Sequence, residues 1–120
     1  MAWQVEVTDE FKAWYADQPE PVQNAIAAKV ALLEEHGPHL GRPHAETLAK
    51  QSQHPNMKEL RVQCSGDAYR VLFAFDHRRV AVLLMGDRKP DDGWYKKAVP
   101  RADKLYATLL KELSEEGHLD

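Results

Sequence analysis

Three consecutive segments in the middle of the chain carry its strongest hydrophobic pattern. Apolar and polar side chains alternate between residues 57 and 64 and again between 69 and 76, which is the period of a β-strand. Residues 79–86 contain the longest continuous apolar run, as expected of a strand that is buried on both faces. Polar turns at 65–68 and 76–78 separate the segments, so Met57 to Lys89 is predicted to form a meander of three antiparallel strands.

The N-terminal part of the chain predicts one short strand and two helices. Residues 3–7 alternate apolar and polar side chains, which indicates a strand with one buried face. Thr8 or Asp9 can cap a following helix, in which Phe11, Trp14 and Tyr15 recur at helical spacing. A proline-containing break at 18–21 precedes a second helix, which we expect to start at Pro21 and to end at Gly37-Pro38.

The remaining segments predict a long loop and a last helix. Residues 37–56 are polar and rich in Gly, Pro and His, which is typical of a functional or mobile loop. A metal site at His36, His39 and His44 is disfavoured because no Cys and no i, i+4 His pair accompanies them. The last helix is expected to open at Pro100, to carry an apolar stripe from Ala102 to Leu113, and to close at Gly117.

These elements give the order β-α-α-β-β-β-α. We therefore predict one α+β domain spanning residues 1–120, with an antiparallel sheet and helices packed on one of its faces. The N-terminus does not resemble a signal peptide, and no window is apolar enough to cross a membrane. The single cysteine, Cys64, excludes an internal disulfide, so we expect a soluble cytoplasmic protein that makes no membrane contact.

Charge is distributed unevenly along the chain, although its net value is only −3. Residues 57–104 hold eleven Lys and Arg against seven Asp and Glu, a net charge of +4, and the rest of the chain carries −7. Such asymmetry favours a basic working face on the meander, while an ordinary mixed surface is the simpler alternative.

Strand parity predicts where the cations of the meander lie. Tyr69, Val71 and Phe73 share the face expected to lie under the helices, so Arg70 is expected on the open face. Arg61 points there too if the first strand pairs in its natural register, and two further cations lie at strand ends. The four side chains predicted to converge on one concave surface are Lys58, Arg61, Arg70 and Arg88.

Clustered cations suit an RNA phosphate backbone or a phosphoryl transition state. Tyr95 and Trp94 follow the last strand and are candidates to stack on an unpaired base. Two structural alternatives remain open: Arg70 pairs with Glu59 across the strands, and Trp94 only covers the last helix. The possible general bases are Glu59, Asp76 and Asp87, and their spacing selects none of them; His77 is expected to be a solvated turn residue.

Several motifs together resemble the HigB-like branch of the RelE/ParE toxin superfamily, which includes phage Gp49-like proteins. The resemblance runs from Phe11 to the last helix. Its most specific part is the pair Lys-Glu-Leu-Arg (58–61) and Tyr-Arg-Val-Leu-Phe (69–73). The loop Gly-Pro-His-Leu-Gly-Arg-Pro-His (37–44), the segment Leu-Leu-Met-Gly (83–86) and Lys89 also match.

The resemblance implies the toxin of a type II toxin–antitoxin pair that inhibits translation by cutting mRNA in the ribosomal A site. The reaction would need no metal ion or other cofactor, because the RNA 2′-hydroxyl attacks the adjacent phosphate. By motif, Arg70 and Arg88 would stabilise the phosphate, while Arg61 and Lys58 would bind backbone phosphates or assist proton transfer. Tyr95 would stack on or activate the nucleotide, and further RNA contacts are expected from Lys89, Trp94 and Lys96.

The same resemblance implies partners and leaves two alternatives. The partner would be a small HigA-like antitoxin, and such antitoxins are often helix-turn-helix proteins. The toxin itself would not bind operator DNA and would reach it only in complex with the antitoxin. One alternative is a ParE-like toxin that inhibits DNA gyrase by binding it. The other is a catalytically degenerate member that acts only as a co-repressor with its antitoxin. An RNA cutter needs the set Arg61, Arg70 and Arg88, whereas a gyrase binder does not.

Overall fold

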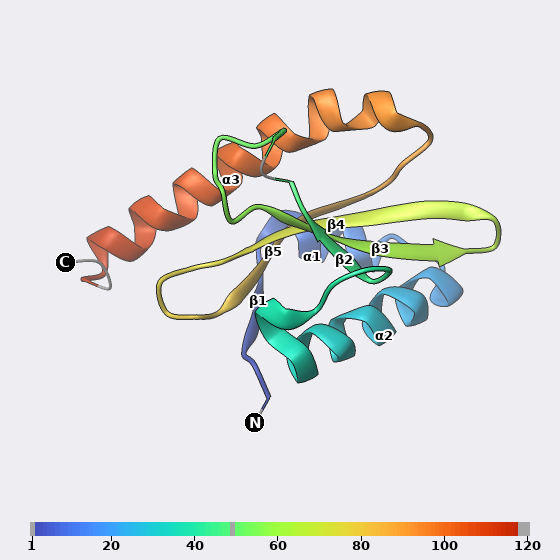
Figure 1. The fold of residues 1–120 in the computed structure, drawn as a ribbon, viewed down its shortest axis with the longest axis horizontal. Coiled ribbons are helices and arrows are strands. Elements are labelled where there is room, and N and C mark those ends of the chain that lie inside the picture. The colour runs from blue at the N-terminus through green and yellow to red at the C-terminus, as the bar shows by residue number, and fades with distance from the viewer. Residues whose placement is uncertain (1, 49, 118–120) are drawn as a thin grey trace.

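One five-stranded sheet organises the structure, a computed structural model that describes residues 2–48 and 50–117. The strands are β1 (Val5–Val7), β2 (Ala45–Thr47), β3 (Lys58–Cys64), β4 (Asp67–Phe75) and β5 (Ala81–Arg88). Their spatial order is β1-β5-β4-β3-β2 (Figure 1). All neighbouring strands are antiparallel except β1, which runs parallel to β5.

The predicted meander is confirmed as β3, β4 and β5. Strands β3 and β4 pair without interruption from Lys58 opposite Phe73 to Cys64 opposite Asp67. The predicted loop at 37–56 is in part wrong, because it contains a short 3₁₀ turn (Gly37–His39) and the edge strand β2. Buried Leu40, Ala45 and Leu48 anchor this segment to the core.

Both predicted N-terminal helices are confirmed. Helix α1 (Asp9–Ala16) is capped by Thr8, whose hydroxyl oxygen accepts a hydrogen bond from the Phe11 amide at 3.0 Å. Helix α2 (Glu20–His36) carries Pro21 in its first turn and ends at Gly37, whose φ is +58°. Glycine is required here because a Cβ atom would lie 2.3 Å from the Trp3 ring.

The last helix begins earlier than predicted. Helix α3 runs from Tyr95 to Glu115, after a 3₁₀ turn at Asp92–Trp94, and Pro100 lies inside it. Proline in the helix interior removes one intrahelical hydrogen bond, here the one to the carbonyl of Lys96. Buried Ala98 and Val99 anchor the turn that precedes the proline, so packing against the sheet outweighs this loss.

The prediction that helices pack on one face of an otherwise open sheet is wrong. Helices α1 and α2 cover one face, with Phe11, Ile26 and Leu33 against Val71 and Phe73. Helix α3 covers the other face, where Val99, Ala102 and Tyr106 pack with Leu72 and Ala74 (Figure 1). The physical reason is that β4 and β5 are apolar on both sides, and an apolar sheet face has to be buried.

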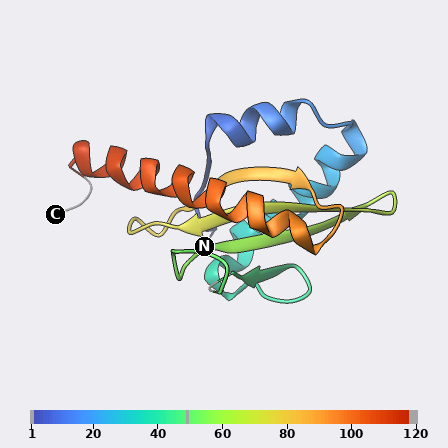
Figure 2. The same ribbon diagram turned by 90° about the horizontal axis from the view of Figure 1, so that it is seen from above.

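Helix α3 leaves part of its sheet face uncovered. Its C-terminal half extends past the strands, as Figure 2 shows, while its N-terminal turn lies beside β3 and β4. Among the described residues, no helix is both long enough and apolar enough to span a membrane. The uncovered part of the sheet, next to the start of α3, holds the candidate site.

Candidate functional site

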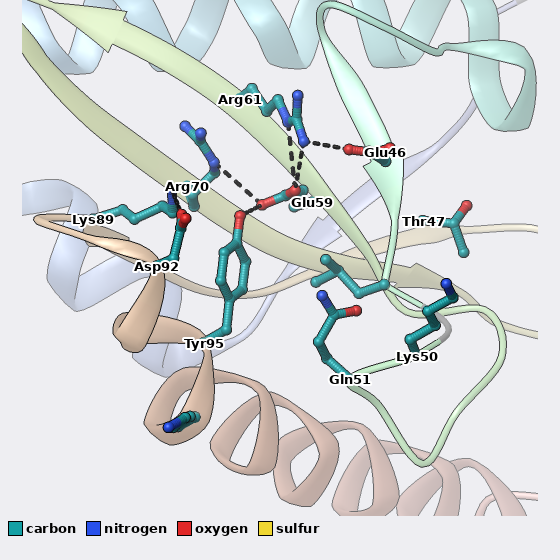
Figure 3. A pocket seen from close by; sticks show the side chains of 12 residues that line it. Glu46, Thr47, Lys50, Gln51, Glu59, Arg61, Arg70, Lys89, Asp92 and Tyr95 are labelled. Atoms are coloured by element: carbon teal, nitrogen blue, oxygen red, sulfur yellow. Dashed lines mark hydrogen bonds and ion pairs between the residues drawn. The ribbon is translucent and has the colours of Figure 1, made fainter.

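A cleft of about 840 Å³ lies between the sheet and the first turn of α3 (Figure 3). Strands β2, β3 and β4 supply its floor, and the segments after β2 and β5 supply its sides. Three carboxylates and five cations line it: Glu46, Glu59 and Asp92, with Lys50, Arg61, Arg70, Lys89 and Lys96. The cleft is therefore net positive in a chain that is net negative.

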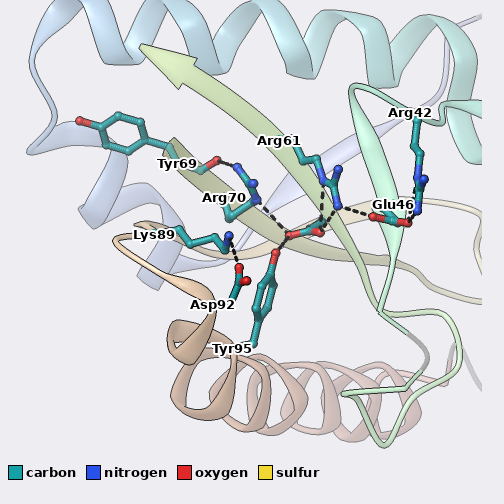
Figure 4. Close-up of polar contacts among 9 residues, drawn as sticks. Arg42, Glu46, Arg61, Tyr69, Arg70, Lys89, Asp92 and Tyr95 are labelled. Carbon is teal, nitrogen blue, oxygen red and sulfur yellow. Dashed lines mark hydrogen bonds and ion pairs between the residues drawn. The ribbon is translucent and has the colours of Figure 1, made fainter. Parts of the chain in front are cut away.

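Glu59 lies at the centre of the polar contacts in this cleft. The residue is only 1% exposed, yet its carboxylate faces three polar partners (Figure 3). Figure 4 also shows these partners, Arg61, Arg70 and Tyr95. The Tyr95 hydroxyl donates a hydrogen bond to Oε1 at 2.7 Å, and Arg70 Nε lies 3.2 Å from the same oxygen. Arg61 Nη2 lies 3.4 Å from Oε2. The carboxylate thus connects β3, β4 and α3.

Strand register explains why a carboxylate is needed here. Arg61 and Arg70 are directly opposite one another on β3 and β4. Like charges at such a position repel, and burial strengthens the repulsion. Glu59 lies two residues before Arg61 on the same face of β3, so its charge compensates both guanidinium groups.

Arg70 is buried more deeply than Arg61. It is 8% exposed, and its Nη1 donates a hydrogen bond to the Tyr69 carbonyl at 3.0 Å. Its Nε–H is not aligned with Glu59, so this buried nitrogen has an ion-pair contact but no hydrogen bond. Most buried polar groups in proteins have a hydrogen-bond partner, so this arrangement is uncommon.

Arg61 is the more accessible of the two arginines, with 34% of its side chain exposed. It also pairs with Glu46 on the edge strand β2, and Glu46 in turn binds Arg42. The hydrogen bond from Arg42, assisted by the charge of Arg61, holds the pKa of Glu46 below its usual range. Charges therefore alternate from Arg42, outside the cleft, through Glu46, Arg61 and Glu59 to Arg70.

Tyr95 joins the first turn of α3 to this network. Burial, and then its hydrogen bond to Glu59, raises the pKa of the Tyr95 hydroxyl above its ordinary value. It therefore stays protonated at neutral pH and acts as a hydrogen-bond donor. Lys89 Nζ lies 5.3 Å from the centre of the Tyr95 ring and 2.8 Å from Asp92 Oδ1.

The structure brings together five of the side chains predicted from sequence: Arg61, Arg70, Lys89, Tyr95 and Lys96. The predicted convergence of Lys58 and Arg88 with them is wrong. Lys58 lies opposite Phe73, on the face covered by α1 and α2, where its Nζ donates to the Thr47 hydroxyl at 2.9 Å. The prediction relied on the position of Lys58 at the end of a strand, but the face of its side chain follows from the strand register.

Arg88 and Trp94 also lie outside the cleft lining. Arg88 is opposite Tyr69 on the α1–α2 face, with Nη1 3.6 Å from Asp67 Oδ1. The Trp94 Nε1–H donates to Asp87 at 3.0 Å, and its ring packs beside the α3 core. The alternative that Arg70 pairs with Glu59 is confirmed. Trp94 does pack beside the last helix, as the other alternative requires.

Sequence reasoning missed the central position of Glu59 and the whole contribution of β2. The signal for Glu59 was its parity with Arg61, which places the two on one face of a strand. Nothing in the sequence indicated Glu46, because its segment reads as loop. Among residues 2–48 and 50–117, no group of three His, Cys, Asp or Glu side chains is arranged to hold a metal ion.

Comparison with known proteins identifies the family. Residues 13–107 match the family model described as phage-derived protein Gp49-like. The chain is 36% identical over 110 residues to a Mycobacterium tuberculosis protein named as a candidate toxin, HigB3, covering 90% of this chain and 92% of that protein. It is 33% identical over 118 residues to a second candidate toxin of that organism, HigB2, but spans only 58% of its length.

Solved structures support the fold. The Escherichia coli toxin RelE, in a free double mutant, matches with a TM-score of 0.62 at 16% identity, covering 84% of this chain and 98% of that one. A toxin–antitoxin complex from Mycobacterium tuberculosis, RelBE2, contains a chain that matches with a TM-score of 0.55 at 16% identity. The match covers 74% of this chain and 100% of that one. These structures show that the chain shares the RelE fold. The family-model match and the sequence relatives place the chain in the Gp49-like family, among HigB-like proteins.

Proposed function

We propose that this chain is the toxin of a type II toxin–antitoxin pair and that it cuts mRNA on the ribosome. The observation that carries the proposal is the cleft lined by Arg61, Lys89 and Lys96, in which the buried Glu59 pairs with Arg61. Two relatives named as candidate toxins support the same role. The cleft charge fits a polyanionic substrate, whereas the rest of the chain is acidic.

The chemistry proposed is an internal transesterification of RNA. The 2′-oxygen bonds to the adjacent phosphorus while the bond to the 5′-oxygen of the next nucleotide breaks. The 2′-hydroxyl loses a proton to a general base, and the leaving 5′-oxygen takes one up. Negative charge builds on the phosphoryl oxygens in between, so the main requirement of the site is fixed positive charge. No external cofactor enters this balance.

The site residues divide into contacting and positioning groups. We assign the phosphate contact to Arg61, whose guanidinium is partly exposed, assisted by Lys89 and Lys96 at the cleft wall. Arg70 and Glu59 are too buried to reach a nucleotide without rearrangement, and they hold Arg61 and Tyr95 in place. The substrate phosphate competes with Glu46 for Arg61, so binding has to displace that edge-strand carboxylate.

An antitoxin is the proposed partner. Solved structures similar in fold include toxin–antitoxin complexes from Mycobacterium tuberculosis and Pyrococcus horikoshii. By the resemblance of its motifs, the antitoxin of this chain would be HigA-like, and the pair would repress its own operon. Neutralisation would require the antitoxin to block access of Arg61 and Lys96 to RNA, either directly or by excluding the ribosome.

The test is mRNA cleavage on purified programmed ribosomes by wild type, Arg61→Ala and Arg88→Ala. We expect Arg61→Ala to lose about 100-fold in rate, the usual effect of removing one transition-state contact. Arg88→Ala is the matched control, since it removes an arginine from the opposite face, and it should cleave as wild type. Circular dichroism verifies that each variant is folded.

Two results would contradict the proposal. Failure of the folded wild type to cleave mRNA on ribosomes would move the assignment to gyrase binding or to co-repression. Equal loss in Arg88→Ala and Arg61→Ala would mean that the reaction does not take place in this cleft.

A further inference from the structure

Strand β1 leaves one edge of the sheet free. It pairs with β5 through alternate residues, so that the Ala81 amide donates to the Gln4 carbonyl and the Thr8 amide donates to the Leu83 carbonyl. The N–H and C=O groups of Val5 and Val7 therefore point away from β5. Among the described residues, these four groups have no hydrogen-bond partner.

This edge is only three residues long, which is one of the ways in which proteins protect a free strand, but Lys, Pro and a bulge, which serve the same purpose elsewhere, are missing from it. Residues 4–7 contain no Lys, no Pro and no bulge. Val7 is 46% exposed, and it is the one large apolar residue that is exposed in the described part of the chain. Two contacts limit the length of the edge: the Trp3 amide donates to the Glu34 carbonyl at one end, and α1 begins at the other.

Two grooves of opposite character flank the edge. An apolar groove of about 340 Å³ lies between β1, α1 and α2, lined by Val5, Phe11, Tyr15, Ile26 and Val30. On the other side of the strand a groove of about 430 Å³ runs under α3. Glu6, Asp9, Glu10 and Glu112 line this second groove, and none of the residues 2–48 and 50–117 that line it is Lys or Arg. Arg78 pairs with Glu6, and Arg101 pairs with Glu10. The groove remains net negative because Asp9 and Glu112 line it as well.

We propose that the free edge of β1 is a docking strand for an extended segment of a partner protein in which apolar and basic side chains alternate. The segment adds a sixth strand through the free groups of Val5 and Val7. Because successive side chains of a strand point to opposite faces, its apolar residues enter the α1–α2 groove and its Lys or Arg residues enter the acidic groove. If the proposed function holds, this partner is the antitoxin. Only the identity of the partner rests on the proposed function; the docking strand itself does not.

The docking strand is separate from the RNA cleft. The cleft is built on β2, β3 and β4, whereas β1 lies at the opposite edge of the sheet, beyond β5 (Figure 1). Opposite charge also separates them, because the cleft is net positive and the groove beside β1 is net negative. A basic segment is therefore attracted to β1 and repelled from the cleft.

The test uses the full chain and two ten-residue synthetic peptides, one alternating Val with Lys and the other alternating Val with Glu. Amide hydrogen exchange followed by NMR should show new protection at Val5 and Val7 when the Val/Lys peptide is added. Glu6 and Thr8, whose amides already bond to β5, should change little. The Val/Glu peptide should give no protection, because the acidic groove repels it.

Val7→Pro gives a second measurement. It removes an outward-pointing N–H while leaving the ladder with β5 intact, so the fold should persist. We expect about tenfold weaker binding of the Val/Lys peptide, since a backbone hydrogen bond is lost and the ring obstructs the edge. Val7→Ala keeps the N–H group, so its affinity for the Val/Lys peptide should fall less than that of Val7→Pro. Arg61→Ala, designed to abolish cleavage, should bind the peptide as wild type does.

Three outcomes would overturn the inference. Protection that needs no peptide and rises with protein concentration would mean that a second copy occupies the edge. Equal protection by both peptides would contradict the charge assignment. No protection at Val5 and Val7 would exclude strand addition. Because Arg61→Ala reports on the cleft alone, failure of ribosomal cleavage and failure of strand docking remain distinguishable.

Discussion

A single buried carboxylate, Glu59, decides the arrangement of the cleft. Two arginines that face one another across β3 and β4 would repel without it, and Tyr95 would lose its hydrogen-bond acceptor. Replacing a buried ion pair by apolar residues is often neutral or stabilising. Retaining charge at this position is therefore better explained by the geometry it gives to Arg61 than by stability.

Removing the carboxylate should be costly. Glu59→Ala leaves Arg70 buried without its counter-ion, so we expect a loss of about 3–5 kcal/mol in the free energy of unfolding, measured by urea denaturation. Arg88→Ala, at a mostly exposed pair, should change it by less than about 0.5 kcal/mol. A similar small effect for both variants would contradict the central role of Glu59.

The raised pKa of Tyr95 has a consequence at alkaline pH. A group whose folded-state pKa exceeds its unfolded value stabilises the fold fully below the unfolded pKa, about 10 for tyrosine, and this stabilisation is lost as pH rises through the folded pKa. The melting temperature of the wild type should therefore fall between pH 9 and 11.

Tyr95→Phe isolates this effect. The variant keeps the aromatic ring over Lys89 but has no titrating hydroxyl, so its melting temperature should fall less steeply over the same range. Tyr106, whose pKa burial also raises, contributes equally to both proteins. Parallel curves for wild type and Tyr95→Phe would show that Tyr95 does not contribute.

At the scale of elements, α1 packs against β5 through one close approach. A Cβ on Gly86 would lie 2.3 Å from the Trp14 ring, so the glycine lets the indole rest on the strand backbone. Gly86→Ala should cost about 1–3 kcal/mol of unfolding free energy through overpacking.

A double variant tests that this cost comes from the indole ring. Trp14→Leu combined with Gly86→Ala should recover part of the loss, giving a coupling energy of about 0.5 kcal/mol or more in urea unfolding. Additive effects of the two substitutions would contradict the contact.

Strand parity explains how most of the cleft residues meet, and it also explains why the predicted positions of Lys58 and Arg88 were wrong. Glu59 and Arg61 share a face because they are two residues apart on β3, and Arg70 joins them through the register of β4. Lys58 is one residue away from Glu59 and so takes the opposite face. Arg88 follows the same rule, because it is opposite Tyr69 and Tyr69 lies on the α1–α2 side.

At the scale of the whole molecule, charge is separated between two edges of the sheet. The cleft beside β2 and β3 is net positive, and the groove beside β1 is net negative. Excess negative charge elsewhere limits non-specific attraction to nucleic acid, so binding of RNA has to depend on the cleft itself.

Salt dependence distinguishes a cleft contact from general attraction. If Lys96 neutralises one phosphate, Lys96→Ala should reduce the slope of log affinity against log salt by about 0.7 for single-stranded RNA, measured by fluorescence anisotropy. Lys97→Ala is the matched control, since Lys97 is a neighbouring exposed lysine that does not line the cleft. Equal changes in both slopes would contradict a defined RNA path.

The sequence by itself determined the elements and the alternation of faces. Period-two patterns gave β3 and β4, and the Thr8 cap and Gly37 gave the limits of the first two helices, because local sterics and hydrogen bonding decide these features. The resemblance of its motifs to those of a known family also indicated the family. The helix start at Tyr95 instead of Pro100 was missed, since packing of Ala98 and Val99 overrides the local preference of proline.

Only the tertiary structure decided which residues meet. The placement of α3 on the second sheet face, the strand formed by Ala45–Thr47, and the joining of Glu46 to Arg61 all depend on contacts between distant segments. Period and composition cannot specify these contacts, because they follow from how the apolar surfaces of the whole chain are buried together. That packing makes Glu59 the centre of the cleft and leaves the edge of β1 free.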